Sequence, residues 1–458
     1  MPLLALLALV AIAPPPQDWV PARWPSGDPK SLELLQGTPV NCLVLEPGDW
    51  SPSFSQAAAK AGVATLGVIR PGPDANALSQ KAGQTGLTGI VLEGNFDAST
   101  MPKDPPPSLV IVPLGLRSKI HFDAPPSAIV GTNQGLWPGI HPEDQGATHA
   151  AASGAVWIDT NAGFLRFAHA ATAATVWIGN TPPAGTIYPV ERYLQAIGDA
   201  AMNGARWVVA LDSDFSKRML KGDARALSDW RRIGRELAFY ESHKDWRGYQ
   251  AFGKLALVES AQSGALLSGG VLDMIATKHT PVRPVPPSKV TPEFFEGSEM
   301  AVDVDPGSLT QAQKDALKAF TRSGGTLLTG PPGWKFPSLQ LDQITLSKED
   351  TEKLDQIWKE LNSMTGRRNL GARLFNASTL LSNMVAPADG KPVVLHLVNY
   401  SDYPVENLTV QLLGKYSKAV LYRADSDKAV TLELYPTEEG VGFDIDKMGV
   451  SAAIVLTP

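Results

Sequence analysis

Carboxylate and amide side chains follow the ends of several short apolar runs, and these groups are the ones in the chain best suited to acid–base chemistry. In "LTGIVLEGNFD", residues 87–97, Glu93 comes directly after apolar residues and directly before Gly94. Glutamate is a poor helix N-cap and a poor turn former. The position therefore predicts either a catalytic carboxylate or a buried ion pair with an arginine such as Arg70.

A second carboxyl group about 5–9 Å from the first is needed to hydrolyse a glycosidic bond. Asp212 in "RWVVALDSDF" and Asp159 in "AVWIDTN" are the candidates for nucleophile or base. Both also fit the N-cap of a following helix, and this alternative stays open for each. Glu46 precedes Pro-Gly, which also fits a solvated turn. The residues expected to contact a substrate are Glu46, Arg70, Asn133, Asn161, Asn180 and Asp214, with Trp137 as a platform for a sugar ring.

The apolar runs are expected to be strands that bring these side chains to one edge of a sheet. They alternate with Ala-rich helical stretches over residues 17–250, and continuous hydrophobicity is typical of parallel strands covered on both faces. Eight such units predict a (β/α)8 barrel, whose active site lies at the C-terminal ends of the strands. A doubly wound open sheet is the alternative, and "ARW" at 22–24 is an extra candidate strand that would shift the strand count by one. The eight runs span 41–46, 63–69, 87–94, 108–115, 127–132, 155–161, 174–180 and 206–212.

The rest of the chain predicts two further units. Residues 251–388 again alternate strand and helix, which favours a flavodoxin-like α/β domain. One helix there has Ser308 or Thr310 as its N-cap and ends before Gly324. Residues 389–458 contain six short strands and no helical pattern, which predicts a small antiparallel β-sandwich.

Composition narrows the classes of function. The formal charge of −6 provides no basic footprint, so we expect no nucleic-acid partner. Cys42 is the single cysteine and lies in an apolar run, so it predicts a buried thiol and no intrachain disulfide. The seven histidines show no H-x-x-x-H spacing, and no segment matches a nucleotide-binding loop, so neither a metal nor another cofactor is expected.

The N-terminus has the pattern of a signal peptide over residues 1–16. Leu3 to Ala13 is an apolar run followed by proline, and its last three residues match an A-x-A cleavage site. The run is too short to span a bilayer as a helix. We therefore expect a secreted or periplasmic protein that is not membrane-bound after processing; the alternative is an unprocessed apolar tail.

The order of the three predicted units resembles the plan of secreted bacterial glycoside hydrolases, including β-galactosidases with a trimerisation domain. "LTQAQKDALKAFTRSGGTLLTG", residues 309–330, is similar to the helix–Gly-Gly–strand passage of those middle domains, whose fold is amidotransferase-like. "VVLHLVNYSDYPVENLTVQL", residues 393–412, looks like the sandwich that follows many glycosidase barrels. The middle segment has no cysteine nucleophile, so amidotransferase activity is not expected. The resemblance implies a carbohydrate substrate and an oligomer contact through the middle domain.

The same resemblance implies catalytic glutamates after strands four and seven. Counted from residue 41, the fourth run ends at Gly115 and the seventh at Asn180, so the sequence departs from this pattern. Two hypotheses follow. In one, Glu93 is the general acid/base of a glycoside hydrolase, with Asp212 or Asp159 as nucleophile or base. In the other, the chain is a non-catalytic member of the same architecture that binds glycan or has a structural role.

Overall fold

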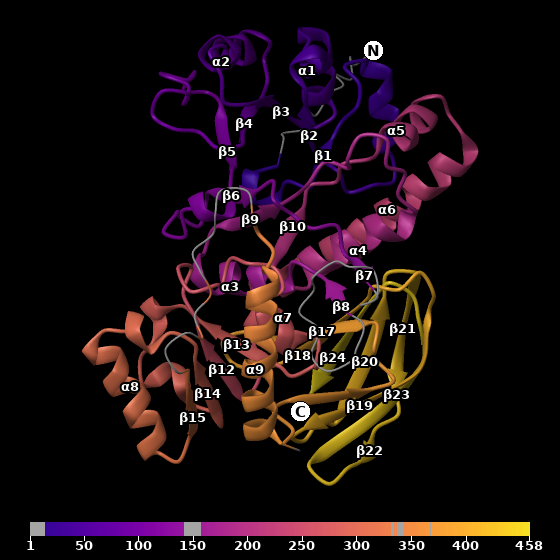
Figure 1. The fold of residues 1–458 in the computed structure, drawn as a ribbon. Helices are drawn as coiled ribbons and strands as arrows, with labels where there is room; N and C mark the ends of the chain where they lie inside the picture. The colour runs from indigo at the N-terminus through magenta and orange to yellow at the C-terminus, as the bar shows by residue number, and fades with distance from the viewer. Residues whose placement is uncertain (1–13, 142–156, 331–333, 335, 337–342, 367) are drawn as a thin grey trace, which may run out of the picture.

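A computed structural model describes residues 14–141, 157–330, 334, 336, 343–366 and 368–458. Most of the expected signal peptide, residues 1–13, lies outside the described residues. Parallel strands form the upper part of the molecule in Figure 1, with a second α/β unit and an antiparallel region below. No helix in the described part of the chain is long and apolar enough to cross a membrane.

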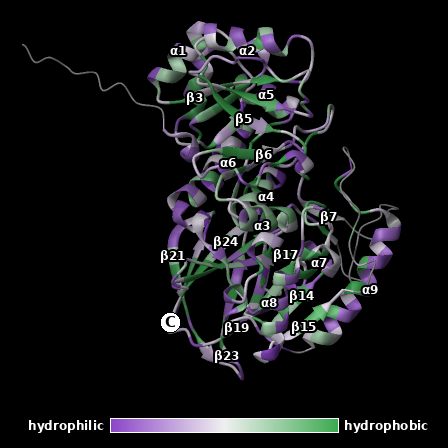
Figure 2. Ribbon diagram, turned by 90° about the vertical axis from the view of Figure 1, so that its left-hand side faces the viewer, coloured by the Kyte–Doolittle hydropathy of each residue, from purple (hydrophilic) through white to green (hydrophobic). Residues whose placement is uncertain are grey.

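The N-terminal half contains two parallel sheets. The first has five strands in chain order: β1 (Pro21–Arg23), β2 (Cys42–Leu45), β3 (Ala64–Ile69), β4 (Gly89–Glu93) and β5 (Val110–Leu114). The second has the order β10-β9-β6 and comprises β6 (Ile129–Thr132), β9 (Thr175–Ile178) and β10 (Ala205–Trp207). Figure 2 shows that β3, β5 and β6 are predominantly hydrophobic. Every residue of β3 and β6 is buried, as expected for strands covered on both faces, whereas Ile111 and Pro113 of β5 are exposed.

Single parallel bridges join the edges of these two sheets. Ala22 of β1 pairs with Val209 just beyond β10, and Gly115 just beyond β5 pairs with Thr132 of β6. The backbone N–H of Arg23 donates to the carbonyl oxygen of Val209 at 2.7 Å. The bridges place the described parallel strands in one cyclic order, but each bridge is a single residue pair, so the hydrogen-bonded ladder itself is not closed.

The prediction that 155–161 forms one of the parallel strands is wrong. β8 (Trp157–Asp159) pairs antiparallel with β7 (Gly139–His141), because Ile158 packs against residues of the C-terminal region such as Leu381 and Val398. The "ARW" segment forms β1 instead. The count therefore shifts by one, so that β4 is the fourth parallel strand of the described chain and β9 is the seventh.

Helices pack against the parallel strands, and several begin at the caps that their sequences favour. They are α1 (Pro52–Lys60), α2 (Ala75–Gln84), α3 (Ala162–Ala171), α4 (Val190–Ala201), α5 (Ser213–Leu220) and α6 (Ala224–Ser242). Ser51 caps α1 by accepting a hydrogen bond from the N–H of Phe54. The buried face of α6 carries Trp230 and Ile233, in agreement with the helical spacing of its apolar residues.

The second α/β unit is built on a four-stranded parallel sheet with the order β13-β12-β14-β15. This order, with the second strand outside the first, is that of the flavodoxin-like arrangement. Thr310 rather than Ser308 caps α8, in a capping box with Gln313, and Gly324 follows the helix with φ of +100°. The elements are β12 (Leu255–Val258), α7 (Val271–Ala276), β13 (Val282–Val285), β14 (Met300–Asp303), α8 (Gln311–Arg322), β15 (Thr326–Thr329) and α9 (Lys348–Thr365).

Two antiparallel sheets form the C-terminal region, as the sequence predicts. Leu395 and Ile454 of one sheet and Leu408 and Phe443 of the other lie in one buried cluster. One sheet has the order β11 (Gln250–Ala251), β17 (Leu380–Ala386), β18 (Val393–Asn399), β24 (Ser451–Thr457), β20 (Lys418–Arg423) and β21 (Ser426–Leu432). The other has the order β16 (Ala372–Phe375), β19 (Val405–Leu413), β23 (Gly440–Met448) and β22 (Tyr435–Pro436). β16 and β17 therefore belong to this region, although they precede residue 389.

Candidate functional site

Four charged side chains meet at the C-terminal ends of the first four parallel strands. Arg23 ends β1, Glu46 follows β2, Arg70 follows β3 and Glu93 ends β4. Because neighbouring parallel strands run in the same direction, their C-terminal ends lie at one edge. Gly94 has φ of +114°, a conformation that favours glycine, and it turns the chain directly after Glu93. We call Arg23, Glu46, Arg70 and Glu93 the rim cluster.

Each carboxylate of the rim cluster contacts both guanidinium groups. Arg70 binds Glu46 with two hydrogen bonds, Nη1 to Oε2 at 2.7 Å and Nη2 to Oε1 at 2.8 Å. The same Nη2 lies 2.8 Å from Oε2 of Glu93. Arg23 forms ion pairs with Glu93 and, at 3.3 Å, with Glu46. The cluster therefore has alternating charges and no net charge, and the ion pair between Glu93 and Arg70 is one of the two outcomes that the sequence predicts.

Burial divides the rim cluster into an inner and an outer pair. The side chains of Glu93 and Arg23 are 8% and 15% exposed, whereas those of Glu46 and Arg70 are 47% and 52% exposed. The hydrogen bonds from Arg70 lower the pKa of Glu46 below its ordinary value. Burial lowers the pKa of Arg23 to about 10, so both Arg23 and Glu46 are charged at neutral pH.

The geometry brings two carboxyl groups close together. Oε1 of Glu46 and Oε2 of Glu93 each lie 2.8 Å from Nη2 of Arg70, so these oxygens are at most 5.6 Å apart, twice that distance. Retaining glycosidases hold their two carboxyl groups about 5–5.5 Å apart. Glu46, which the sequence places only among the substrate contacts, is thus the carboxylate beside Glu93.

Asp212 is buried and caps α5. Its Oδ1 accepts a hydrogen bond from the N–H of Phe215 at 2.8 Å. Its Oδ2 accepts hydrogen bonds from the hydroxyl of Tyr193 at 2.8 Å and from the N–H of Tyr188 at 3.3 Å. The contacts of Asp212 are therefore those of a helix N-cap, which is the alternative to a catalytic role.

The other two predicted aspartates do not join the rim cluster. Asp159 ends the antiparallel strand β8, which places it outside the row of parallel strand ends. Asp214 lies in the first turn of α5 and pairs with Arg218 at 2.7 Å, one helical turn later. Asp214 thus has the contacts expected of a surface residue near a helix N-terminus.

The predicted amide residues bind other parts of the chain. Asn161 is fully buried, donates to Asp199 at 2.9 Å and accepts from the guanidinium of Arg117 at 3.0 Å. The side chain of Asn180 donates to the carbonyl oxygen of Gly135 at 2.8 Å. Asn133 continues the β5–β6 contact through its backbone N–H, which donates to Gly115 at 3.3 Å.

Trp137 lies in an aromatic cluster and is only partly exposed. It stacks on Tyr188 with ring centroids 4.8 Å apart and meets the edges of Trp207 and Tyr193 at 5.1 and 5.4 Å. Aromatic packing of this kind stabilises the segment beyond β6. The faces that a sugar ring would use are thus partly covered by protein.

Arg23 is the site residue that sequence reasoning missed. The signal was present, because "ARW" is recognised as an extra strand and Arg23 stands where that strand ends. Once β1 is counted, its C-terminal residue is expected beside the end of β2. A short strand with one charged residue carries too weak a pattern to show this by itself.

Thiol and metal chemistry find no support at the rim. Cys42 is fully buried in β2, and burial raises the pKa of its thiol well above the ordinary value. In the part of the chain that the structure describes, no group of three or more His, Cys, Asp or Glu side chains is arranged to hold a metal ion.

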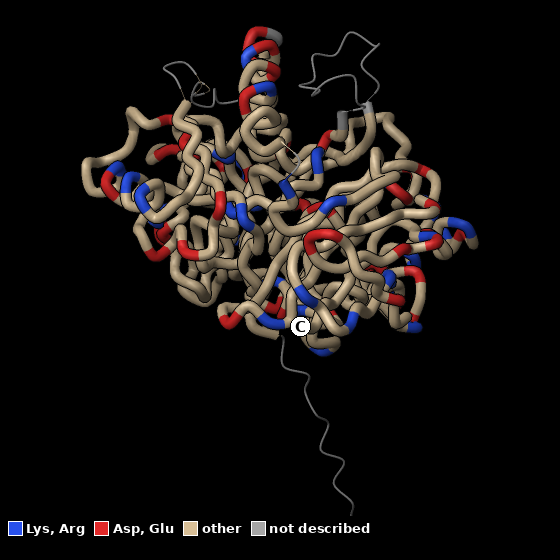
Figure 3. Tube along the Cα trace, turned by 90° about the horizontal axis from the view of Figure 1, so that it is seen from below, with Lys and Arg blue, Asp and Glu red and all other residues tan. Residues whose placement is uncertain are grey.

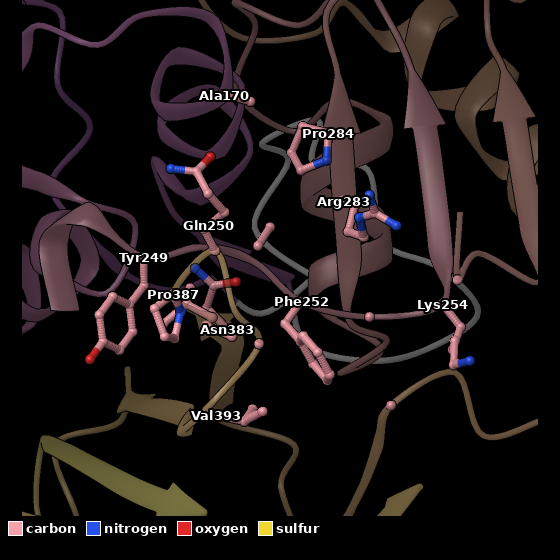
Figure 4. A pocket seen from close by; sticks show the side chains of 18 of the residues that line it. Ala170, Tyr249, Gln250, Phe252, Lys254, Arg283, Pro284, Asn383, Pro387 and Val393 are labelled. Carbon is pink, nitrogen blue, oxygen red and sulfur yellow. The ribbon is translucent and has the colours of Figure 1, made fainter. Parts of the chain in front are cut away.

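A large cavity lies away from the rim cluster. It has a volume of about 950 Å³ and is lined by residues near the ends of α3 and α4, by β13 and by the C-terminal region (Figure 4). None of the four rim residues lines it. Cavity volume and carboxylate geometry thus indicate two different places on the molecule.

Comparison with known sequences finds no counterpart: no protein-family model and no curated protein matches the chain. Solved structures do match. α-L-Fucosidase isoenzyme 2 from Paenibacillus thiaminolyticus is 12% identical, with a TM-score of 0.62 over 96% of this chain and 98% of that protein.

Two other solved structures are more distant. A rhamnosidase from Novosphingobium sp. PP1Y is 12% identical, with a TM-score of 0.43 over 90% of this chain and 39% of its own. An apo exo-carrageenase from Bacteroides ovatus is 11% identical, with a TM-score of 0.38 over 76% and 52%. Nothing about the fold is inferred from these two TM-scores, and the similarity of fold rests on the fucosidase. The chain has a glycoside-hydrolase-like fold, and identity of 12% shows the fold alone.

Proposed function

We propose that the chain is a secreted glycoside hydrolase-like protein that acts on an oligo- or polysaccharide at the rim cluster. The observation that carries the proposal is the placement of a carboxylate oxygen of Glu46 at most 5.6 Å, twice 2.8 Å, from one of Glu93, at the ends of β2 and β4, the two strands on either side of β3. The fold of the fucosidase supports it. We further infer that the eight parallel strands of the described chain form a barrel of the (β/α)8 type, since the edge bridges put them in cyclic order.

The burial of the two carboxylates suggests their roles. Glu93 keeps the buried Arg23 as a partner, and this ion pair orients its carboxylate for the role of nucleophile or base. Glu46 is held by the half-exposed Arg70, and a substrate that displaces Arg70 frees Glu46 to hold a proton. This assignment gives Glu93 the nucleophilic role instead of the acid/base role expected from sequence. The short separation predicts that hydrolysis retains the anomeric configuration.

A non-catalytic protein that binds glycan is the second candidate. Its supporting observation is that both carboxylates of the rim cluster are neutralised by arginines. In addition, β9 is followed by Asn180, whose side-chain amide is bound to Gly135, and not by a glutamate. In this alternative the cluster stabilises the strand ends and performs no chemistry.

A panel of glycan substrates separates the two candidates. The wild type is expected to hydrolyse at least one glycan with retention of configuration, followed by NMR of the first-formed anomer. Glu93→Gln is expected to lower the rate by at least about 10²-fold. Glu33→Gln, an exposed glutamate with no ion pair to the rim cluster in the described part of the chain, is the matched control and is expected to keep the wild-type rate.

The result is interpreted with a thermal melt of each variant, so that loss of folding is not read as loss of chemistry. Unchanged hydrolysis by a folded Glu93→Gln variant contradicts the assigned role. Binding of glycans without hydrolysis by the wild type favours the second candidate. The secretion part of the proposal rests on the apolar run of residues 3–13, and recovery of a shortened chain from outside the cytoplasm checks it.

A further inference from the structure

The 950 Å³ cavity lies where three parts of the molecule meet. Figure 4 shows Phe252 and Lys254 on the segment that follows β11, with Arg283 on the neighbouring strand β13 and Asn383 from β17. Small-molecule sites occupy about 300–1,000 Å³ and are frequent at domain interfaces. The size and position of this cavity are therefore those of a ligand site.

The cavity is at the opposite end of the parallel strands from the rim cluster. His169 and Ala170 line it and come shortly before β9, and Met202, Asn203 and Gly204 come directly before β10. The rim residues instead lie at the ends where β1 to β4 finish. A ligand in the cavity is thus independent of the chemistry proposed at the rim.

Positive charge dominates the lining. The acidic side chains among the described lining residues are Glu296 and Glu299, and Glu299 pairs with Lys254 at 3.6 Å. The basic ones are Arg166, Lys254, Arg283, Lys289, Lys391 and Lys415. This excess occurs in a chain with a formal charge of −6. In Figure 3, several Lys and Arg segments lie around the C-terminus, and Pro458 lines the cavity.

Two arginines in the lining are held in place by the protein. Arg283 donates to the carbonyl oxygen of Phe294 at 2.6 Å and to the hydroxyl of Ser298 at 3.0 Å. Its guanidinium lies over the ring of Phe294, 4.7 Å from the centroid. An arginine fixed in this way loses little freedom when it pairs with an acid group.

Arg166 is the second of these arginines and is 4% exposed. Its Nε and Nη2 donate to Asn203 and Ser382, whereas Nη1 has no hydrogen-bond partner in the described part of the chain. Burial lowers the pKa of Arg166 to about 10, and the nearby carboxylates of Asp273 and Asp199 oppose this shift. Because this Nη1 is itself buried, Arg166 contributes positive charge to the wall of the cavity and not an exposed donor.

The remaining lining is suited to a sugar. Tyr249 and Phe252 contribute aromatic rings, and Gln250 contributes a side-chain amide between them in sequence (Figure 4). Aromatic rings pack against the apolar faces of pyranoses, and an amide serves their hydroxyl groups.

We propose that this interdomain cavity binds an acidic saccharide. Its carboxylate or sulfate groups pair with Lys289, Lys415 and Arg283, and its rings pack on Tyr249 and Phe252.

Calorimetric titration of the full chain at low salt tests the proposal with three probes. Tetragalacturonate carries carboxylates, a sulfated galactan tetrasaccharide carries sulfates, and fully methyl-esterified tetragalacturonate is a neutral control of the same length. Binding of either acidic probe without binding of the ester supports the proposal, and the probe that binds identifies the acid group. Binding of neither acidic probe, or equal binding of the ester, overturns it.

Variants locate the binding. The double substitution Lys289→Gln with Lys415→Gln is expected to weaken the acidic probe about tenfold, because two exposed charge pairs are lost. Lys30→Gln with Lys60→Gln removes the same charge from exposed positions outside the cavity and is expected to leave binding unchanged. Equal weakening by both pairs, or loss of binding in Glu93→Gln, overturns the assignment to the cavity. Retention of binding in Glu93→Gln keeps this inference independent of the proposed hydrolysis.

Discussion

The rim cluster and the interdomain cavity treat charge in opposite ways. At the rim, Arg23 and Arg70 neutralise Glu46 and Glu93 within one network. In the cavity, basic side chains outnumber acidic ones. Lys254 forms an ion pair with Glu299, which also lines the cavity. The ion pairs of the rim cluster have to open before its carboxylates can react, whereas the excess positive charge of the cavity can bind an acidic ligand directly. Stability is therefore expected to depend on the rim, and salt-sensitive binding on the cavity.

The largest expected effect is on stability, from the inner arginine of the rim. Arg23→Gln leaves the buried Glu93 with one partner instead of two, and breaking a buried ion pair costs about 3–5 kcal/mol. Since Arg70 remains, we expect a loss of about 3 kcal/mol in the free energy of unfolding. Chemical denaturation measures it.

Arg70→Gln is the matched control, because this side chain is half exposed and its pairs are screened by water. We expect a cost of less than about 1 kcal/mol for this variant. Equal costs for the two substitutions would show that burial does not divide the cluster into inner and outer pairs.

The second largest expected effect is a difference in salt dependence between the two regions. Exposed lysines lose their attraction for an anion as the Debye length falls from about 10 Å at 0.1 M to about 3 Å at 1 M salt. Affinity of the cavity for tetragalacturonate is expected to fall about tenfold over that range. The rate on a neutral glycan at the rim is expected to stay nearly constant. Calorimetry and a hydrolysis assay in the same buffers compare them, and parallel losses would remove the distinction.

The smallest effect concerns pH. Contact with Arg70 lowers the pKa of Glu46 below its ordinary value of 4.5. A carboxylate whose pKa is lower in the folded state adds stability above the unfolded pKa, and that stability is lost as the pH falls through the folded pKa. Because Glu46 is half exposed, the contribution is less than about 1 kcal/mol.

Thermal melts of wild type and Glu46→Gln between neutral and acidic pH test this contribution. The difference in melting temperature is expected to be present at pH 7 and to shrink below about pH 4. A difference that grows on acidification would contradict the expectation that ionised Glu46 stabilises the folded state.

Local pattern was sufficient for much of the fold and for one half of the site. Continuous apolar runs identify β2 to β6, β9 and β10, because strands covered on both faces have to be apolar throughout. The sequence limits the cap of α8 to Ser308 or Thr310, and the structure shows that Thr310 is the cap. Glu93 was singled out because a glutamate at that place has no simple role in a turn or cap.

The remainder depended on contacts between residues distant in sequence. Arg23 and Glu93 are 70 residues apart in the sequence. Their pairing depends on β1 joining the sheet beside β2, and a run of three residues is too short to predict that. Residues 155–161 have the same apolar pattern as the parallel strands, but β8, which covers Trp157–Asp159, pairs antiparallel with β7 and packs against the C-terminal region through Ile158.

The sequence alone determined most of the parallel strands and which carboxylate is unusual, because hydrophobic period and capping act over a few residues. Tertiary structure decided that Glu46 stands beside Glu93 while Asp212 caps α5, and it assembled the cavity from residues between Arg166 and Lys415. The physical reason is that ion pairing and cavity shape depend on which strand ends and domain surfaces meet in space.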